Sequence, residues 1–126
     1  MKRILVLSTV FVMLFIVGVP ESIAGDQSAL ESRLAYLSDI PEISSVKLVR
    51  NNVYIGFNKR PIDMSTIVRG AAVFGNRAYG ARVHVWACVF NANEPNPEKW
   101  RYYCSATGQN GKVKKVTVGN NVLLLC

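Results

Sequence analysis

The sequence predicts a small single domain of the α+β class, in which a mainly antiparallel sheet is packed by helices. Two segments carry apolar residues at helical spacing, several short segments alternate apolar and polar residues, and Asn- and Gly-containing turns separate them. The predicted order of elements is α-β-β-α-β-β-β-β. Residues 25–126 contain all of these elements, and 102 residues is a length typical of one domain.

Residues 1–24 have the layout of a cleavable signal peptide. Lys2 and Arg3 precede an apolar run from Ile4 to Val19, and the small residues Ser22 and Ala24 then mark a cleavage site after Ala24. The 16-residue run is shorter than the roughly 20 residues that span a bilayer. We therefore expect an exported protein, periplasmic or secreted, with no transmembrane segment after signal cleavage.

The first helix is predicted from Ser28 to about Ser38, ending before Pro41. Ser28 followed by Glu31 forms a capping box at its start. Its apolar stripe consists of Leu30, Leu34 and Leu37.

A β-hairpin is predicted over residues 46–58. Asn51-Asn52 forms its two-residue turn, which places Arg50 opposite Val53. The residues expected on its buried face are Val46, Leu48, Ile55 and Phe57.

A second helix is predicted to begin at Asp63. Gly70 and Gly75 flank its apolar stripe and would let the helix lie close to a sheet, although Gly75-Asn76 is also a possible helix end. The stripe consists of Ile67, Ala71, Phe74 and Ala78.

From about Ala29 to Val89, the order helix, hairpin, helix and strand is loosely similar to small exported modules of the BON type, which associate with envelopes. The strand sequence Val53-Tyr54-Ile55-Gly56 adds to this resemblance. The chain lacks the Gly-Val pair that those modules usually place before their last strand. The resemblance therefore implies an envelope-associated module without assigning the family.

The C-terminal part is predicted to be a four-stranded meander. A polar loop with two prolines spans residues 91–99, and Asn110-Gly111 is the strongest hairpin signal of the chain. We expect Ser105 to lie opposite Val116, and Val116 opposite Leu124. The predicted strands are Arg82 to Phe90, Trp100 to Thr107, Val113 to Val118 and Val122 to Cys126.

Three cysteines in an exported chain suggest one disulfide bond and one remaining thiol. Placing Phe90 opposite Tyr102 sets Cys88 opposite Cys104, whereas the meander turns Cys126 to the other face. We therefore predict a Cys88–Cys104 disulfide, with a bond from Cys126 to another chain as the alternative. Because no close cysteine pair has metal-ligand spacing, neither a metal site nor a cofactor is predicted.

The strand over residues 82–90 has two apolar faces. One carries Val83, Val85, Ala87 and Val89 and is predicted to be core. The other carries Arg82, His84, Trp86, Cys88 and Phe90, and continues into Trp100, Tyr102 and Cys104. Either the first helix or a partner subunit covers this second face, or it is an exposed platform for bases, sugars or a peptide. The candidate binding residues are Arg82, His84, Trp86, Trp100, Arg101 and Tyr102.

Charge and missing motifs limit the possible functions. Residues 25–126 contain 13 cationic and 7 anionic side chains. This excess favours an anionic partner, or serves solubility alone, since the charges are scattered along the chain. No P-loop, dinucleotide fingerprint, nucleophile elbow or zinc-protease helix is present. His84, the sole histidine, has no evident catalytic partner, and Glu94 and Glu98 lie in a polar loop.

The leading hypothesis is a non-enzymatic binding or accessory protein of the cell envelope. It would engage a protein or an anionic polymer, and could form a homo-oligomer. The alternatives are a small secreted nuclease or other hydrolase acting on an anionic polymer, and an inhibitor that inserts residues 91–99 into a secreted enzyme.

Overall fold

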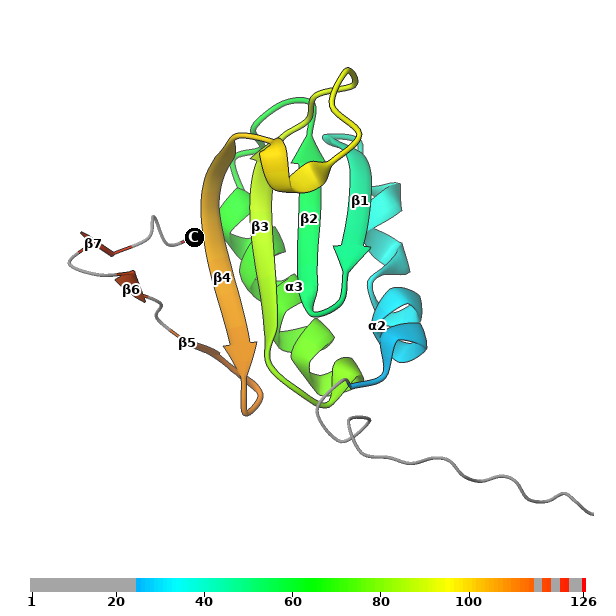
Figure 1. Ribbon diagram of the computed structural model, residues 1–126, viewed down its shortest axis with the longest axis vertical. Helices are drawn as coiled ribbons and strands as arrows, with labels where there is room; N and C mark the ends of the chain where they lie inside the picture. The colour runs from blue at the N-terminus through cyan, green and yellow to red at the C-terminus, as the bar shows by residue number, and fades with distance from the viewer. Residues whose placement is uncertain (1–24, 115–116, 119–120, 123–125) are drawn as a thin grey trace, which may run out of the picture.

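A computed structural model describes residues 25–114, 117–118, 121–122 and 126. It contains a five-stranded sheet whose order, β1-β2-β3-β4-β5, follows the order of the chain. Helices α2 and α3 lie on one face of this sheet (Figure 1). The predicted α+β class is confirmed. The predicted signal peptide lies outside the described residues, among which no helix is long and apolar enough to cross a membrane.

The N-cap of the first helix lies two residues earlier than predicted. Asp26, not Ser28, is the N-cap of α2 (Gln27–Arg33), and its carboxylate accepts a hydrogen bond from the Ala29 amide at 3.0 Å. The chain then tightens into the 3₁₀ helix η2 (Ala35–Asp39). The predicted stripe is confirmed, because all three of its leucines are buried: Leu30, Leu34 and Leu37.

Strands β1 (Ile43–Val49) and β2 (Asn52–Phe57) form the predicted hairpin with a different turn. Val49 pairs with Asn52, so Arg50 and Asn51 form the turn, with Arg50 at a φ of 57°. The predicted pairing of Arg50 with Val53 is therefore wrong. The Asn51 carbonyl accepts a hydrogen bond from the backbone amide of His84 at 2.9 Å, which holds the turn against the strand that contains His84. The predicted buried face is nevertheless the one that contacts the core.

Helix α3 (Met64–Tyr79) connects β2 to β3 (Val83–Val89), which pair in parallel. Asp63 occupies the N-cap position, as predicted, but its side chain makes no capping hydrogen bond. The helix continues through Gly75 and ends at Gly80, whose φ of 85° is left-handed. Its buried stripe is displaced from the predicted one and consists of Met64, Val68, Ala71, Ala72, Gly75, Asn76 and Tyr79.

Two glycines allow close packing around α3. Gly75 lies against Leu30 of α2 and Val83 of β3, where an added Cβ would come within 3.1 and 3.4 Å of their methyl groups. Gly108 of β4 (Tyr102–Gln109) lies so close to α3 that a Cβ there would overlap the Ala72 carbonyl. Only glycine permits this approach of helix to sheet.

Strand β4 pairs antiparallel with β3 in a register that differs from the predicted one. Cys104 lies opposite Ala87, and after a bulge Tyr102 lies opposite Cys88. Side chains alternate between the two faces of a sheet, so this shift turns Cys104 to the helix side and leaves Cys88 on the other. The predicted core residues Val83, Val85 and Ala87 are fully buried.

The Asn110-Gly111 turn and the register after it are confirmed. Both residues have positive φ, at 56° and 74°, and Thr107 pairs with Lys114 of β5 (Lys112–Lys114), the predicted alignment. Strands β6 (Thr117–Val118) and β7 (Asn121–Val122) then form a separate two-stranded sheet. Thr117 pairs with Val122 there, which is one residue out of the predicted register.

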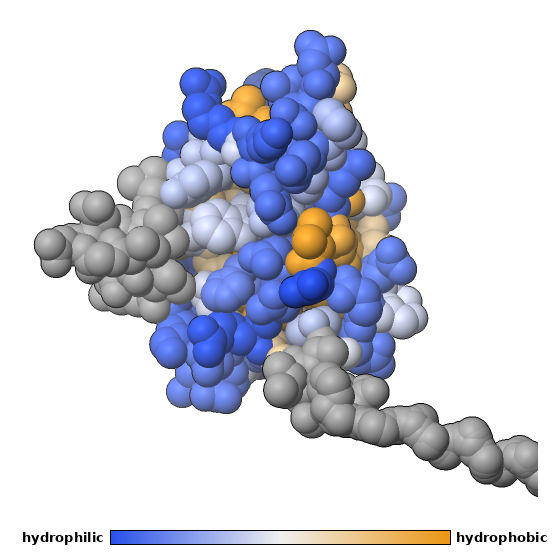
Figure 2. All heavy atoms as spheres, viewed as in Figure 1, coloured by the Kyte–Doolittle hydropathy of each residue, from blue (hydrophilic) through white to orange (hydrophobic). Residues whose placement is uncertain are grey.

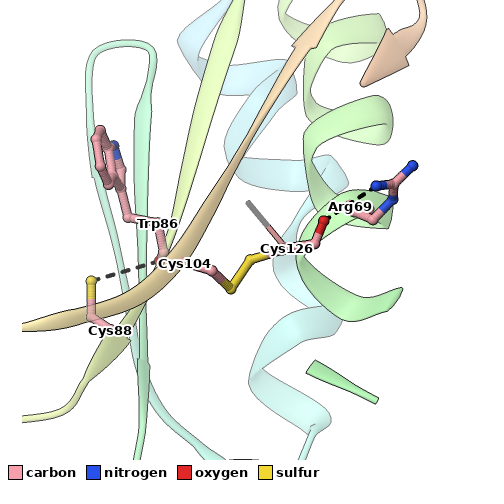
Figure 3. The surroundings of a disulfide bond; sticks show 5 residues. All are labelled: Arg69, Trp86, Cys88, Cys104 and Cys126. Atoms are coloured by element: carbon pink, nitrogen blue, oxygen red, sulfur yellow. Dashed lines mark hydrogen bonds between the residues drawn. A yellow bond between two sulfur atoms is a disulfide. The ribbon is translucent and has the colours of Figure 1, made fainter. Parts of the chain in front are cut away.

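The disulfide bond joins Cys104 to Cys126, so the predicted Cys88–Cys104 bond is wrong. The two bonded residues have Cα atoms 5.2 Å apart, and Figure 3 shows them between β4 and α3. The Cys126 carbonyl accepts a hydrogen bond from Arg69 of α3 at 3.2 Å, and its amide donates to the Ser105 carbonyl at 3.1 Å. Cys88 is a free, buried thiol on the opposite side of the sheet.

Candidate binding site

The face of the sheet away from the helices carries a row of aromatic side chains. Tyr54, Trp86 and Tyr102 come from the neighbouring strands β2, β3 and β4, and we call this surface the aromatic face. The view in Figure 2 looks onto it: side chains of intermediate hydropathy lie among hydrophilic ones, and strongly hydrophobic atoms form small patches only. A surface built from Tyr and Trp rings has this character because each ring carries a polar group.

The first helix does not cover the aromatic face. The side chains of Leu30 and Leu34 lie beside Gly75 of α3, on the opposite side of the sheet. The expectation that the first helix buries these rings is therefore wrong. Two interpretations of the aromatic face are left: a partner subunit covers it, or it is an exposed platform for a ligand.

The rings contact one another in a defined arrangement. Tyr54 and Trp86 are nearly parallel, with centroids 6.4 Å apart and 12° between their planes. Trp86 and Tyr102 meet at 77° with centroids 5.2 Å apart. A second edge-to-face pair, Phe90 with Trp100, has centroids 5.5 Å apart. Such pairs add about 0.5–1.5 kcal/mol each beyond simple burial, so the rings hold one another in place.

A cavity of about 210 Å³ opens between these rings and the loop that joins β3 to β4. We call it the aromatic pocket. Its size is below that of a pocket for a drug-sized molecule, so it fits one small group rather than a whole ligand. Its lining consists of Tyr54, Trp86, Cys88, Pro97, Glu98, Trp100 and Tyr102.

The loop over the pocket, residues 90–101, is held by its own hydrogen bonds. The Trp100 indole N–H donates to the Glu94 carbonyl at 2.8 Å, and the Asn96 side chain caps the 3₁₀ helix η3 (Pro97–Lys99) by accepting from the Glu98 amide at 3.0 Å. Trp100 is 5% exposed and lies over Gly56, where an added Cβ would come within 2.9 Å of the ring. Figure 1 shows this loop in front of the upper ends of β2 and β3. One wall of the pocket is therefore preformed.

Cys88 projects from β3 into the base of the pocket. The residue is 1% exposed, and burial raises the pKa of its thiol to about 12. Its Sγ lies 3.7 Å from the Trp86 carbonyl. Because only the thiolate is a strong nucleophile, this cysteine contributes an apolar, unreactive surface at neutral pH.

The predicted binding residues fall into two groups. Trp86, Trp100 and Tyr102 are brought together at the pocket. His84 lies farther along β3, where its Nδ1 is 2.9 Å from the Thr107 hydroxyl, and burial together with the Arg82 charge lowers its pKa. Arg82 and Arg101 are exposed and do not line the pocket.

Four residues of the pocket lining were not among the predicted binding residues: Tyr54, Cys88, Pro97 and Glu98. Tyr54 alternates with the buried Val53 and Ile55, so its outward orientation was readable. Its place beside Trp86 was not, because it depends on the parallel pairing of β2 with β3. Glu98 lies in the predicted polar loop and is exposed, and η3 places it at the edge of the pocket.

The described part of the chain contains no group of three His, Cys, Asp or Glu side chains that could hold a metal ion. No protein family, curated protein or solved structure matches this chain. The resemblance to BON-type modules accordingly extends no further than the order of the elements. The function has to be inferred from the geometry of the aromatic face.

Proposed function

We propose that this chain is an exported, non-enzymatic binding or accessory protein of the cell envelope, which engages its partner through the aromatic face. The observation that carries this proposal is the aromatic pocket, because three strands and a tethered loop place aromatic rings around an open cavity on the side of the sheet that the helices leave free. Exposed aromatic side chains with adjacent charges are characteristic of recognition surfaces.

Export is supported by two features that do not depend on each other. Residues 1–24 have the composition of a signal peptide, and the Cys104–Cys126 disulfide is of a kind that persists in oxidising compartments. The two together favour a periplasmic or secreted location.

Cationic side chains beside the aromatic rings support an anionic or zwitterionic partner. Lys47 of β1 pairs with Tyr54, and Lys114 of β5 pairs with Thr107, so both lysines project from the aromatic face. Both are exposed. Charges of this kind accelerate encounter with an anionic surface more than they strengthen the final complex.

The experiment that tests the proposal is affinity capture from envelope extracts with matched variants. Tyr102→Ala removes an exposed ring of the aromatic face, and Ile62→Ala removes an exposed apolar side chain outside it. A partner captured by the wild type and by Ile62→Ala, but lost with Tyr102→Ala, supports the proposal. Equal capture by all three proteins counts against the aromatic face as the binding surface.

The non-enzymatic part of the proposal has its own test. Purified protein is incubated with RNA, DNA and envelope polymers, and products are followed over hours. Turnover that His84→Ala abolishes would replace the proposal with the hydrolase hypothesis.

A further inference from the structure

We propose that the aromatic pocket binds a quaternary ammonium group, the cation of choline, betaine and phosphocholine headgroups. This inference rests on the proposed binding function and names the chemistry of the ligand. It follows from the aromatic walls, from the absence of free indole donors and from the charge on the lining.

The walls of the pocket are the faces and edges of four rings, from Tyr54, Trp86, Trp100 and Tyr102. Trp86 and Tyr102 meet almost at right angles, which forms a corner open to the cavity. A ring attracts a cation to its face because its π electrons carry partial negative charge, and several rings around one cation form the cage typical of quaternary ammonium sites.

Both indole N–H groups of the pocket are already bonded within the protein. Trp86 donates to the Asn52 side-chain oxygen at 3.1 Å, and Trp100 donates to the Glu94 carbonyl at 2.8 Å. A sugar or a nucleobase would need several hydrogen-bonding groups from these walls, because its own polar atoms lose water on entering. The lining also carries the Tyr54 and Tyr102 hydroxyls and the Glu98 carboxylate. A quaternary ammonium group has no N–H to satisfy, so it needs no hydrogen-bond partner in the pocket, and the carboxylate complements its charge.

The charge on the lining of the aromatic pocket is negative. Glu98 is the charged side chain among the described residues of the pocket wall, and the cationic side chains of the aromatic face lie outside that wall. Burial raises the pKa of the Tyr54 phenol, and the charge of the nearby Glu98 carboxylate raises it further. A carboxylate at the edge of an aromatic cage complements a cation. Lys47, the cross-strand partner of Tyr54, supplies a positive charge on the same face for the anionic end of a zwitterion.

The test compares choline with 3,3-dimethylbutan-1-ol, which has the same shape and no charge. Binding is followed by tryptophan fluorescence and by calorimetry, at a constant total concentration of chloride. We expect choline to bind about tenfold more tightly than the alcohol, the ratio expected of cation–π attraction worth somewhat over 1 kcal/mol. Equal binding of the two compounds, or no binding of choline, overturns the inference.

Variants locate the site. Tyr102 is 43% exposed, so Tyr102→Ala removes a wall with little effect on folding, whereas Tyr102→Phe keeps the ring. We expect Tyr102→Ala and Glu98→Gln each to weaken choline binding about fivefold, and Tyr102→Phe to retain it. Glu31→Gln, on the exposed side of α2, is the matched charge control and should bind as the wild type does. Choline binding that neither Tyr102→Ala nor Glu98→Gln weakens would contradict the assignment to this pocket.

A further experiment identifies the molecule that carries the quaternary ammonium group. Cosedimentation with phosphatidylcholine vesicles that free choline competes away indicates a lipid headgroup, and binding of choline alone indicates a small soluble ligand. If choline fails to bind while envelope capture still depends on Tyr102, the ligand chemistry is wrong and the binding function stands.

Discussion

Replacing Cys126 by serine should destabilise the protein strongly. The Cys104–Cys126 disulfide closes a loop with a sequence separation of 22 residues. The loss of that closure costs about 3 kcal/mol by chain entropy. For a domain of roughly 100 residues this corresponds to a fall of the unfolding midpoint on the order of 15 °C. Thermal unfolding of the oxidised proteins, followed by circular dichroism, measures the difference directly.

The matched control is Cys88→Ala, which removes the free thiol and leaves the disulfide intact. Its cost should be only about 1 kcal/mol, because a single buried sulfur atom is lost. Peptide mapping of the unreduced wild-type protein should link the peptides of Cys104 and Cys126. If Cys126→Ser melts at the wild-type temperature, or if mapping links Cys88 to Cys104, the strand register described above is incorrect.

Three further predictions concern packing, pH and thiol reactivity. Gly108→Ala should destabilise the fold by about 3 kcal/mol or more, because its Cβ would overlap the Ala72 carbonyl. Gly70→Ala, whose Cβ would have its nearest contact at 3.9 Å, should stabilise α3 by up to about 1 kcal/mol. Urea unfolding of the two variants and the wild type measures both effects. Burial lowers the pKa of His84 in the folded state, so below the ordinary value of 6.5 the unfolded chain binds a proton that the folded chain does not. The free energy of unfolding should therefore decline as pH falls below 6.5. A His84→Gln variant that shows the same decline would rule this cause out. Cys88, with its thiol pKa raised to about 12, should resist iodoacetamide at pH 8 until urea unfolds the chain, and rapid labelling of the native protein would contradict its burial.

The faces of the strands could be predicted from the sequence, because alternation depends only on local geometry. Val83, Val85 and Ala87 are buried as expected, and Trp86 lies on the opposite face. The same logic correctly separated the two faces of the first hairpin. Alternation is therefore a dependable guide to orientation, even where the partner of a strand is unknown.

The register between strands could not be predicted, because it depends on contacts between distant segments. The turn after β1 falls at Arg50-Asn51 since Asn51 is bound to β3, and the bulge near Cys88 shifts the β3–β4 pairing. One residue of shift exchanges the two faces, so a small error moved Cys104 to the wrong side and produced the wrong disulfide.

The same limit applies to the binding site. The rings of Trp86, Trp100 and Tyr102 lie in consecutive strands and the loop between them, and sequence reasoning grouped them. Tyr54 joins them only because α3 returns the chain beside β2, and this pairing has no local signal.

The order of the strands in the sheet has a consequence for the way the chain folds. Every strand of the five-stranded sheet lies beside the strand that precedes it in the chain. The sheet can therefore grow one strand at a time as synthesis proceeds, without waiting for a distant segment to insert between strands already paired. Cys126 follows all five strands in the chain, so it becomes available to bond Cys104 only after the residues of those strands have been made. The disulfide bond can thus fix a sheet whose strands pair in chain order.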